Sequence, residues 1–132
     1  MNGKERIRVA VRIRPESDQT SCIRRNPEIP KSVTIVSEKS NQKADEHSFK
    51  FDDVLGLKQD EVYDNVKDLV VSSLEGYNAT IFAFGMTGSG KTHTITGTLS
   101  DPGVVPRSVT TIFSELAARN LQNPNEMTLA YL

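Results

Sequence analysis

The sequence predicts an α/β fold, on the basis of two hydrophobic patterns and one motif. In several short segments apolar residues stand at every second position, which is typical of strands. In two longer segments they recur every three or four positions, which is typical of helices that bury one face. A glycine-rich motif, residues 85–92, lies between an apolar segment and the start of a helix. The resulting order is strand, helix, strand, helix, strand, as expected for helices covering a sheet.

The first part of the chain is expected to form short strands joined by exposed loops. One strand is marked by apolar residues that alternate with polar ones until Pro15 ends it, namely Ile7, Val9, Val11 and Ile13. The polar residues 16–31 predict a surface excursion, and residues 37–47 predict an exposed loop. Between and after these loops, strands or extended segments are expected at residues 32–36 and around Phe49, Phe51 and Val54.

The clearest predicted helix covers residues 60–74. Its apolar face consists of Val62, Val66, Leu69, Val70 and Leu74, which fall at helical spacing. Gly76 stands where a left-handed C-terminal cap is expected.

A second helix is expected after turn residues at 97–103, with Pro106 near its first turn. Its apolar face would be Val109, Ile112, Phe113 and Leu116. Residues 123–125 should then turn the chain into a strand carrying Met127, Leu129 and Tyr131, which stops in mid-pattern at Leu132. Because a doubly wound sheet usually needs more strands, this favours a partial or unusually small domain.

The composition argues against several classes of function. The net charge is −1, which gives no case for general nucleic-acid binding. Residues 1–50 carry 11 Lys+Arg and 7 Asp+Glu, but the basic residues are scattered, which favours a solvated face. No run approaches the roughly 20 apolar residues of a membrane span, so no membrane partner is expected. Cys22 is the single cysteine, expected to be buried or inert, and it can form no internal disulfide.

The glycine-rich motif fits the phosphate-binding P-loop pattern G-x-x-x-x-G-K-[ST] at every defined position. It comprises Gly85, Met86, Thr87, Gly88, Ser89, Gly90, Lys91 and Thr92. In such a loop the glycines let backbone amides converge on phosphate oxygens. Lys91 can reach the β- and γ-phosphates, and the Thr92 hydroxyl can ligate Mg²⁺. The motif therefore predicts binding of a nucleoside triphosphate.

The sequence around the motif supports this interpretation. A P-loop follows a buried strand and opens a helix. Residues 79–84 are apolar and β-prone, as expected for a strand that is covered on both faces. Residues 92–95 could begin the helix, although threonine is a poor helix former. The alternative is a chance match in a glycine-rich loop, which would need neither a strand before the motif nor a helix after it.

Six segments besides the P-loop resemble, in order and nearly in spacing, the N-terminal part of a kinesin motor domain. They are residues 9–15, 49–54, 59–63, 74–85, 92–97 and 103–107. The R-x-R-P strand end, the G-Y-N-x-T-I-F-A segment and the G-K-T-H-T continuation are more specific than the P-loop alone. The resemblance implies a P-loop NTPase three-layer sandwich of the kinesin type, here truncated. Residues 1–132 would be the N-terminal portion of the motor domain, with ATP or ADP and Mg²⁺ as ligands.

The resemblance also implies a purine pocket. Arg12, Arg14 and Pro15 match the element that flanks the adenine, and Tyr77 and His93 match positions near the base and the sugar. Pro15 would offer a flat apolar edge and Arg14 a stacking cation. Without the resemblance, the arginines would be assigned to the exposed face of a strand and His93 to a structural role.

The sequence departs from the kinesin pattern in two respects. Met86 stands where kinesins most often have Gln, but backbone amides bind the phosphate, so binding should survive. The segments N-x-x-S-S-R-S-H and D-L-A-G-S-E do not occur, and the principal microtubule-contacting elements and the neck linker are expected to lie beyond Leu132 as well. In kinesins the two segments hold Mg²⁺, position the attacking water and sense the γ-phosphate. We therefore assign no catalytic residue and expect these 132 residues to hydrolyse ATP poorly and not to move.

The predicted function is the ATP-binding part of a kinesin-like microtubule motor, acting in the cytoplasm on the microtubule cytoskeleton. The full-length protein could be a homodimer. The alternative is a truncated module that binds nucleotide or a partner without hydrolysis. An unrelated P-loop kinase or GTPase would need an acceptor site or a base-specificity motif, and we find neither. Because a sheet ending at Leu132 leaves an unpaired edge, the isolated chain is expected to be marginally stable or aggregation-prone.

Overall fold

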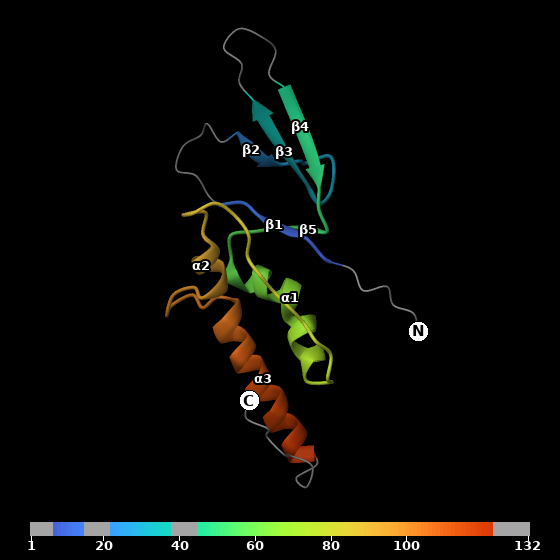
Figure 1. Cartoon of the computed structure of the whole chain (residues 1–132), viewed down its shortest axis with the longest axis vertical. Coiled ribbons are helices and arrows are strands. Elements are labelled where there is room, and N and C mark those ends of the chain that lie inside the picture. The colour runs from blue at the N-terminus through green and yellow to red at the C-terminus, as the bar shows by residue number, and fades with distance from the viewer. Residues whose placement is uncertain (1–6, 15–21, 38–44, 123–132) are drawn as a thin grey trace, which may run out of the picture. The chain divides into compact units, whose positions relative to one another are not determined.

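The computed structural model describes residues 7–14, 22–37 and 45–122 (Figure 1). These residues fall into two compact units, Met1–Leu57 and Lys58–Leu132. The first contains the strands and the second contains the helices, and each is described by itself. Pro15 and the predicted final turn and strand of residues 123–132 lie outside the described residues.

The Met1–Leu57 unit contains two small sheets. A parallel pair is formed by β1 (Ala10–Arg12) and β5 (Asp53–Leu55). An antiparallel sheet has the order β2-β3-β4, with β2 at Ile23–Arg25, β3 at Ser32–Ser37 and β4 at Asp45–Lys50. The central strand β3 holds the buried residues of this sheet, because only it has a neighbour on each side. Its buried Thr34 hydroxyl is satisfied by the hydroxyl of Ser48 at 2.9 Å.

The strands of this unit differ in part from those predicted. β3 is confirmed, whereas β1 is shorter than the alternating pattern of residues 7–13 suggested. Two strands occur where loops were predicted: β2 within residues 16–31, and the start of β4 within residues 37–47. Both are polar and exposed, so they carry no hydrophobic pattern. They form because β3 offers them backbone hydrogen-bond partners, which local sequence does not reveal. Cys22, before β2, is exposed.

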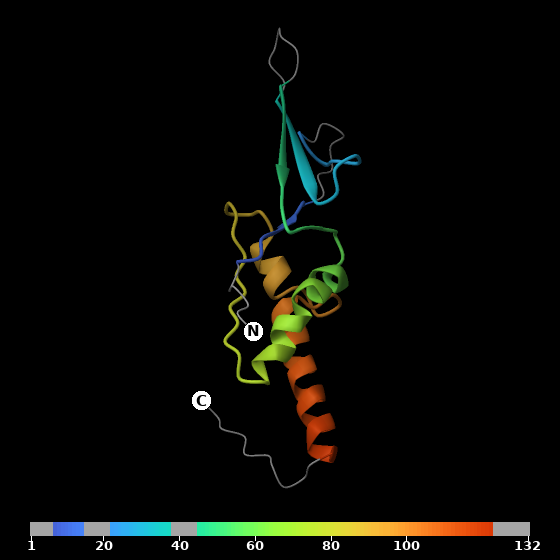
Figure 2. The same cartoon turned by 90° about the vertical axis from the view of Figure 1, so that its right-hand side faces the viewer.

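The Lys58–Leu132 unit is built on two helices that lie side by side (Figures 1 and 2), α1 (Gln59–Ser73) and α3 (Val104–Gln122). Both predicted helices are thereby confirmed. Val62, Tyr63 and Val70 of α1 and Val104 of α3 are buried. The Tyr63 hydroxyl is hydrogen-bonded to the Thr111 hydroxyl at 2.6 Å, which satisfies the polar end of this buried ring. Gly76 has a φ of 88°, as expected for the turn that ends α1.

The predicted apolar face of α3 is only partly covered by the described residues. Ile112 and Leu116 are half-buried, but Val109 is 47% exposed and Phe113 is 63% exposed. Helical spacing therefore identified the helix correctly, while the extent of its burial depends on which elements pack against it. No helix in the described part of the chain is both long and apolar enough to cross a membrane.

The prediction of a covered strand at residues 79–84 is wrong for this structure. The segment runs from the end of α1 to the P-loop without pairing to any strand of the described residues (Figure 2). Phe82 is 76% exposed and Phe84 is 95% exposed. A strand forms only when its backbone groups find partners in a neighbouring strand, and β-prone composition cannot supply them.

The predicted turn at residues 97–103 is confirmed and is fastened to the helices by Arg107. Gly97 and Pro102 form an isolated β-bridge that closes the turn. From α3, the Arg107 Nε donates to the Pro102 carbonyl at 2.6 Å, and its guanidinium pairs with Asp60 of α1. A second, longer ion pair joins Arg107 to Asp101 at 3.4 Å. One side chain thus links α1, α3 and the turn.

Arg107 is expected to contribute more to stability than its ion pair with Asp60. Replacing Asp60 by Asn should lower the free energy of unfolding by only about 0.5 kcal/mol, because this carboxylate is 73% exposed. Arg107→Met should cost about 2 kcal/mol, since it also removes the bond to the Pro102 carbonyl. Urea denaturation of both variants tests this. Equal losses would show that the ion pair, not the backbone contact, fastens the turn.

Candidate nucleotide-binding site

The P-loop joins the extended segment to α2 (Lys91–Ile95), so the predicted helix after the motif is confirmed. Gly90, the residue before α2, has a φ of 103°, a left-handed conformation that favours glycine. The loop curls tightly at its start, where a Cβ atom on Gly85 would lie 2.7 Å from the Ser89 hydroxyl. The N-cap residue Gly90 makes no side-chain hydrogen bond to the start of α2, and the Thr94 N–H donates to its carbonyl at 2.9 Å. The amides at the start of such a helix are suited to binding an anion.

The Lys91 side chain folds back over the beginning of the loop. Its ammonium donates to the carbonyl oxygens of Gly85 at 2.9 Å and Met86 at 2.8 Å. The positive charge is therefore held at the loop rather than extended into solvent. Phosphate oxygens would accept stronger, charge-assisted bonds from the same ammonium.

The loop residues fit a phosphate group with its Mg²⁺. A Cβ atom on Gly88 or Gly90 would meet nothing within 4 Å, so open space borders the backbone at both positions. Thr92 is exposed next to Lys91 on α2, and its hydroxyl is a suitable ligand for a hard cation. Among residues 7–14, 22–37 and 45–122, no three His, Cys, Asp or Glu side chains gather into a metal site.

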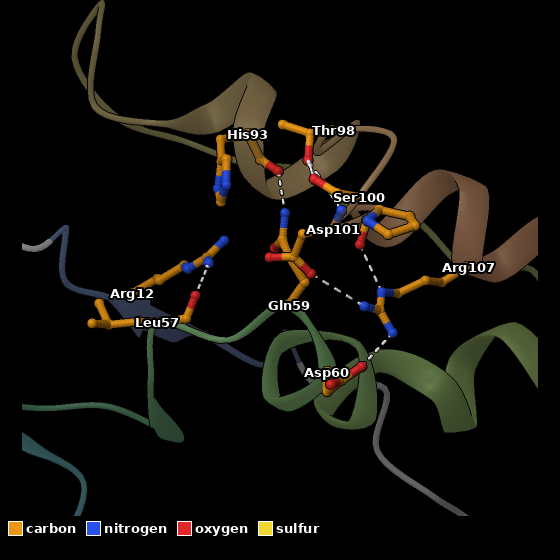
Figure 3. A network of polar contacts seen from close by, with 10 residues as sticks. Arg12, Leu57, Gln59, Asp60, His93, Thr98, Ser100, Asp101 and Arg107 are labelled. Carbon is orange, nitrogen blue, oxygen red and sulfur yellow. Dashed lines mark hydrogen bonds and ion pairs between the residues drawn. The ribbon is translucent and has the colours of Figure 1, made fainter.

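Three of the predicted purine-contacting residues, Arg12, Arg14 and Pro15, belong to the Met1–Leu57 unit. Arg12 ends β1, and its guanidinium donates to the backbone carbonyl of Leu57 (Figure 3). Arg14 follows the strand and is exposed. With Pro15 outside the described residues, the R-x-R-P part of the purine pocket stays a prediction.

The other two predicted purine-contacting residues lie at different places in the Lys58–Leu132 unit. His93 is an exposed residue of α2, two positions after Lys91. Tyr77 is exposed and follows Gly76, eight positions before Gly85 in the sequence. Its part in the purine pocket stays a prediction.

Comparison with known proteins decides the family. Residues 6–132 match the family model described as the kinesin motor domain. The chain belongs to the kinesin motor family. It is 40% identical over 90% of its length to kinesin-like protein KIF27 of Rattus norvegicus. It is 45% identical over 65% of its length to kinesin-related protein 2 of Dictyostelium discoideum. The kinesin resemblance seen in the sequence is thereby confirmed.

A solved kinesin structure shows the same fold over most of the chain. This is a KIF14 segment with ADP in complex with a microtubule, which the chain matches with a TM-score of 0.73 at 28% identity. The match covers 94% of this chain and 35% of the KIF14 chain. The described elements are thus part of the kinesin P-loop NTPase fold. The chain spans 9% of the rat KIF27 relative and 12% of the Dictyostelium relative.

Two residues of this kinesin-family chain that contact α2 or the turn after it were not predicted as site residues. Gln59, at the start of α1, donates to the His93 carbonyl of α2 (Figure 3). Arg107 holds Asp60 and the turn that follows α2. The first contact joins residues 34 positions apart and the ion pair joins residues 47 apart, so no local pattern could reveal either one.

Proposed function

We propose that this chain is the N-terminal, nucleotide-binding portion of a kinesin motor domain and binds ATP or ADP with Mg²⁺. The observation that carries the proposal is the Lys91 ammonium held over a curled, glycine-rich loop at the start of α2. The kinesin family match over residues 6–132 supports it, because that family joins this loop to ATP chemistry. The KIF14 neighbour, solved with ADP, agrees with such a ligand.

Each residue of the loop has a distinct proposed role. Lys91 would neutralise the β- and γ-phosphate oxygens, and the backbone N–H groups of residues 85–90 would donate to them. The Thr92 hydroxyl would hold Mg²⁺, and the ion would supply positive charge to offset the negative charge of the phosphates. Arg12, Arg14, Pro15 and His93 would shape the purine site, a proposal that rests on the family resemblance. Tyr77 would lie near the base and the sugar, a proposal that likewise rests on the family resemblance.

In the full-length protein we propose that nucleotide turnover drives movement on microtubules. The named relatives are kinesin-like and kinesin-related proteins, and the KIF14 neighbour was solved on a microtubule. This proposal places the full-length protein on the microtubule cytoskeleton in the cytoplasm. The 132 residues contain no D-L-A-G-S-E segment, so hydrolysis is proposed for the longer protein and not for these residues alone.

Phosphate release with and without microtubules tests this function. The full-length protein should release phosphate from Mg·ATP faster when microtubules are added, and the 132-residue chain should bind Mg·ATP without this stimulation. A full-length protein that binds nucleotide but ignores microtubules would favour the non-motor module instead. Microtubule-stimulated phosphate release by the 132-residue chain would contradict the proposal that hydrolysis requires the longer protein.

A further inference from the structure

Gln59 has the largest fully buried side chain in the described part of the chain, with 2% of its surface exposed. Burying an amide is unfavourable unless its polar atoms find hydrogen-bond partners. The Gln59 Nε2 donates to the backbone carbonyl of His93 at 2.5 Å (Figure 3). This places a buried donor of α1 against the backbone of α2, two residues after Lys91.

The His93 carbonyl needs a donor from outside its own helix. In a regular helix it would accept from the N–H group four residues later, that of Gly97. Here the Gly97 N–H donates to the Thr92 carbonyl at 3.3 Å, and the Thr96 N–H does the same at 2.8 Å. The carbonyl of His93 is therefore one of the orphan acceptors at the C-terminal end of α2, and Gln59 satisfies it.

The helix that receives this bond has little stability of its own. α2 has five residues, far below the length at which an isolated helix persists in water. It nevertheless carries both Lys91 and Thr92 on its first turn. The orientation of these two side chains must come from contacts with neighbouring elements.

We propose that Gln59 is a positioning residue for nucleotide binding, which fixes α2, and with it Lys91 and Thr92, through the His93 carbonyl. The inference rests on the proposed nucleotide function and adds a determinant of affinity outside the P-loop. Gln59 is itself fixed by its burial, with 2% of its surface exposed, and the adjacent Asp60 pairs with Arg107 of α3. The Arg107 Nε also donates a hydrogen bond to the carbonyl of Pro102, which lies in the turn after α2. α2 is thus supported in two places. Gln59 holds the His93 carbonyl, and the turn at residues 97–103 is fixed beyond the C-terminal end of the helix.

The test compares Gln59→Met with Tyr63→Phe in the full chain. Gln59→Met keeps the side-chain length but removes the donor to α2. Tyr63→Phe removes a buried hydrogen bond between α1 and α3, and the lost bond does not involve α2. We expect the Kd for Mg·ATP to rise about tenfold in Gln59→Met, and to change less than about twofold in Tyr63→Phe. Equal affinities in all three proteins, or equal losses in both variants, would overturn the proposal.

Amide hydrogen exchange without nucleotide separates this proposal from the proposed function. Gln59→Met should speed exchange at the amides of Thr94, Thr96 and Gly97, whereas Tyr63→Phe should not. If the wild-type chain fails to bind Mg·ATP, the proposed function fails, while faster α2 exchange in Gln59→Met still shows that Gln59 holds α2. Unchanged α2 exchange in Gln59→Met would overturn the positioning role, whatever the nucleotide result.

Discussion

Replacing Lys91 by methionine is expected to weaken binding of Mg·ATP about 100-fold, the largest effect on affinity that the structure predicts for one side chain. The ammonium lies over the loop, within 2.9 Å of the Gly85 carbonyl oxygen. Bound phosphates would receive charge-assisted hydrogen bonds from it, each contributing about 1.5–3 kcal/mol. Methionine keeps the aliphatic stem and removes only the charge. Titration with a fluorescent ATP analogue, followed by displacement with ATP, measures the change.

Lys67→Met is the matched control for this substitution. Lys67 is an exposed lysine of α1, so it tests the loss of one positive charge from the same unit. Affinity should stay within about twofold of wild type in this variant, because exposed charges beyond about 10 Å are screened at moderate ionic strength. If Lys67→Met weakened binding as strongly as Lys91→Met, net charge rather than the P-loop would explain the affinity.

The substitution Gly97→Ala is expected to lower the free energy of unfolding by about 3 kcal/mol. Gly97 has a φ of 70°, which strains any residue with a Cβ atom. A Cβ atom there would also come closer than 3.0 Å to backbone atoms of Asp101, Pro102 and Gly103. The left-handed backbone and the overpacking each cost about 1–2 kcal/mol. Urea denaturation followed by circular dichroism would report the loss as a lower midpoint.

The substitution Gly76→Ala separates the cost of the left-handed backbone from the cost of overpacking. Gly76 has a φ of 88°, but a Cβ atom there would meet nothing within 4 Å. Only the backbone strain applies, so we expect a loss of about 1 kcal/mol. Similar losses at both positions would mean that the turn after α2 opens to accommodate the methyl group. The turn would then be too loose to help support α2.

Sequence alone predicted the elements whose residues carry their own pattern. The long amphipathic helix α1, the turn glycines and the short helix after the P-loop all follow from spacing and from local backbone preference. The P-loop is likewise recognised from its eight residues alone, because phosphate binding needs those residue types at those positions. Where a segment determines its own conformation, prediction and structure agree.

The remaining features depend on partners that are distant in the sequence. β2 and β4 are polar strands that exist because β3 lies between them, whereas the apolar residues 79–84 lack a partner strand and stay unpaired. The hydrogen bond from Gln59 to the His93 carbonyl likewise joins residues that are far apart in the sequence. Each is decided by what lies next to the segment in space, which neither periodicity nor propensity reports.

The most direct test of the central claim is a calorimetric titration of the wild-type chain with Mg·ATP, Mg·ADP and adenosine. If the P-loop binds phosphates as proposed, both nucleotides bind with a stoichiometry of one, and adenosine, which has no phosphate, binds far more weakly. Circular dichroism of the same sample must show the helices of the Lys58–Leu132 unit. A helical chain that fails to bind either nucleotide, or that binds adenosine as well as ATP, would contradict the account.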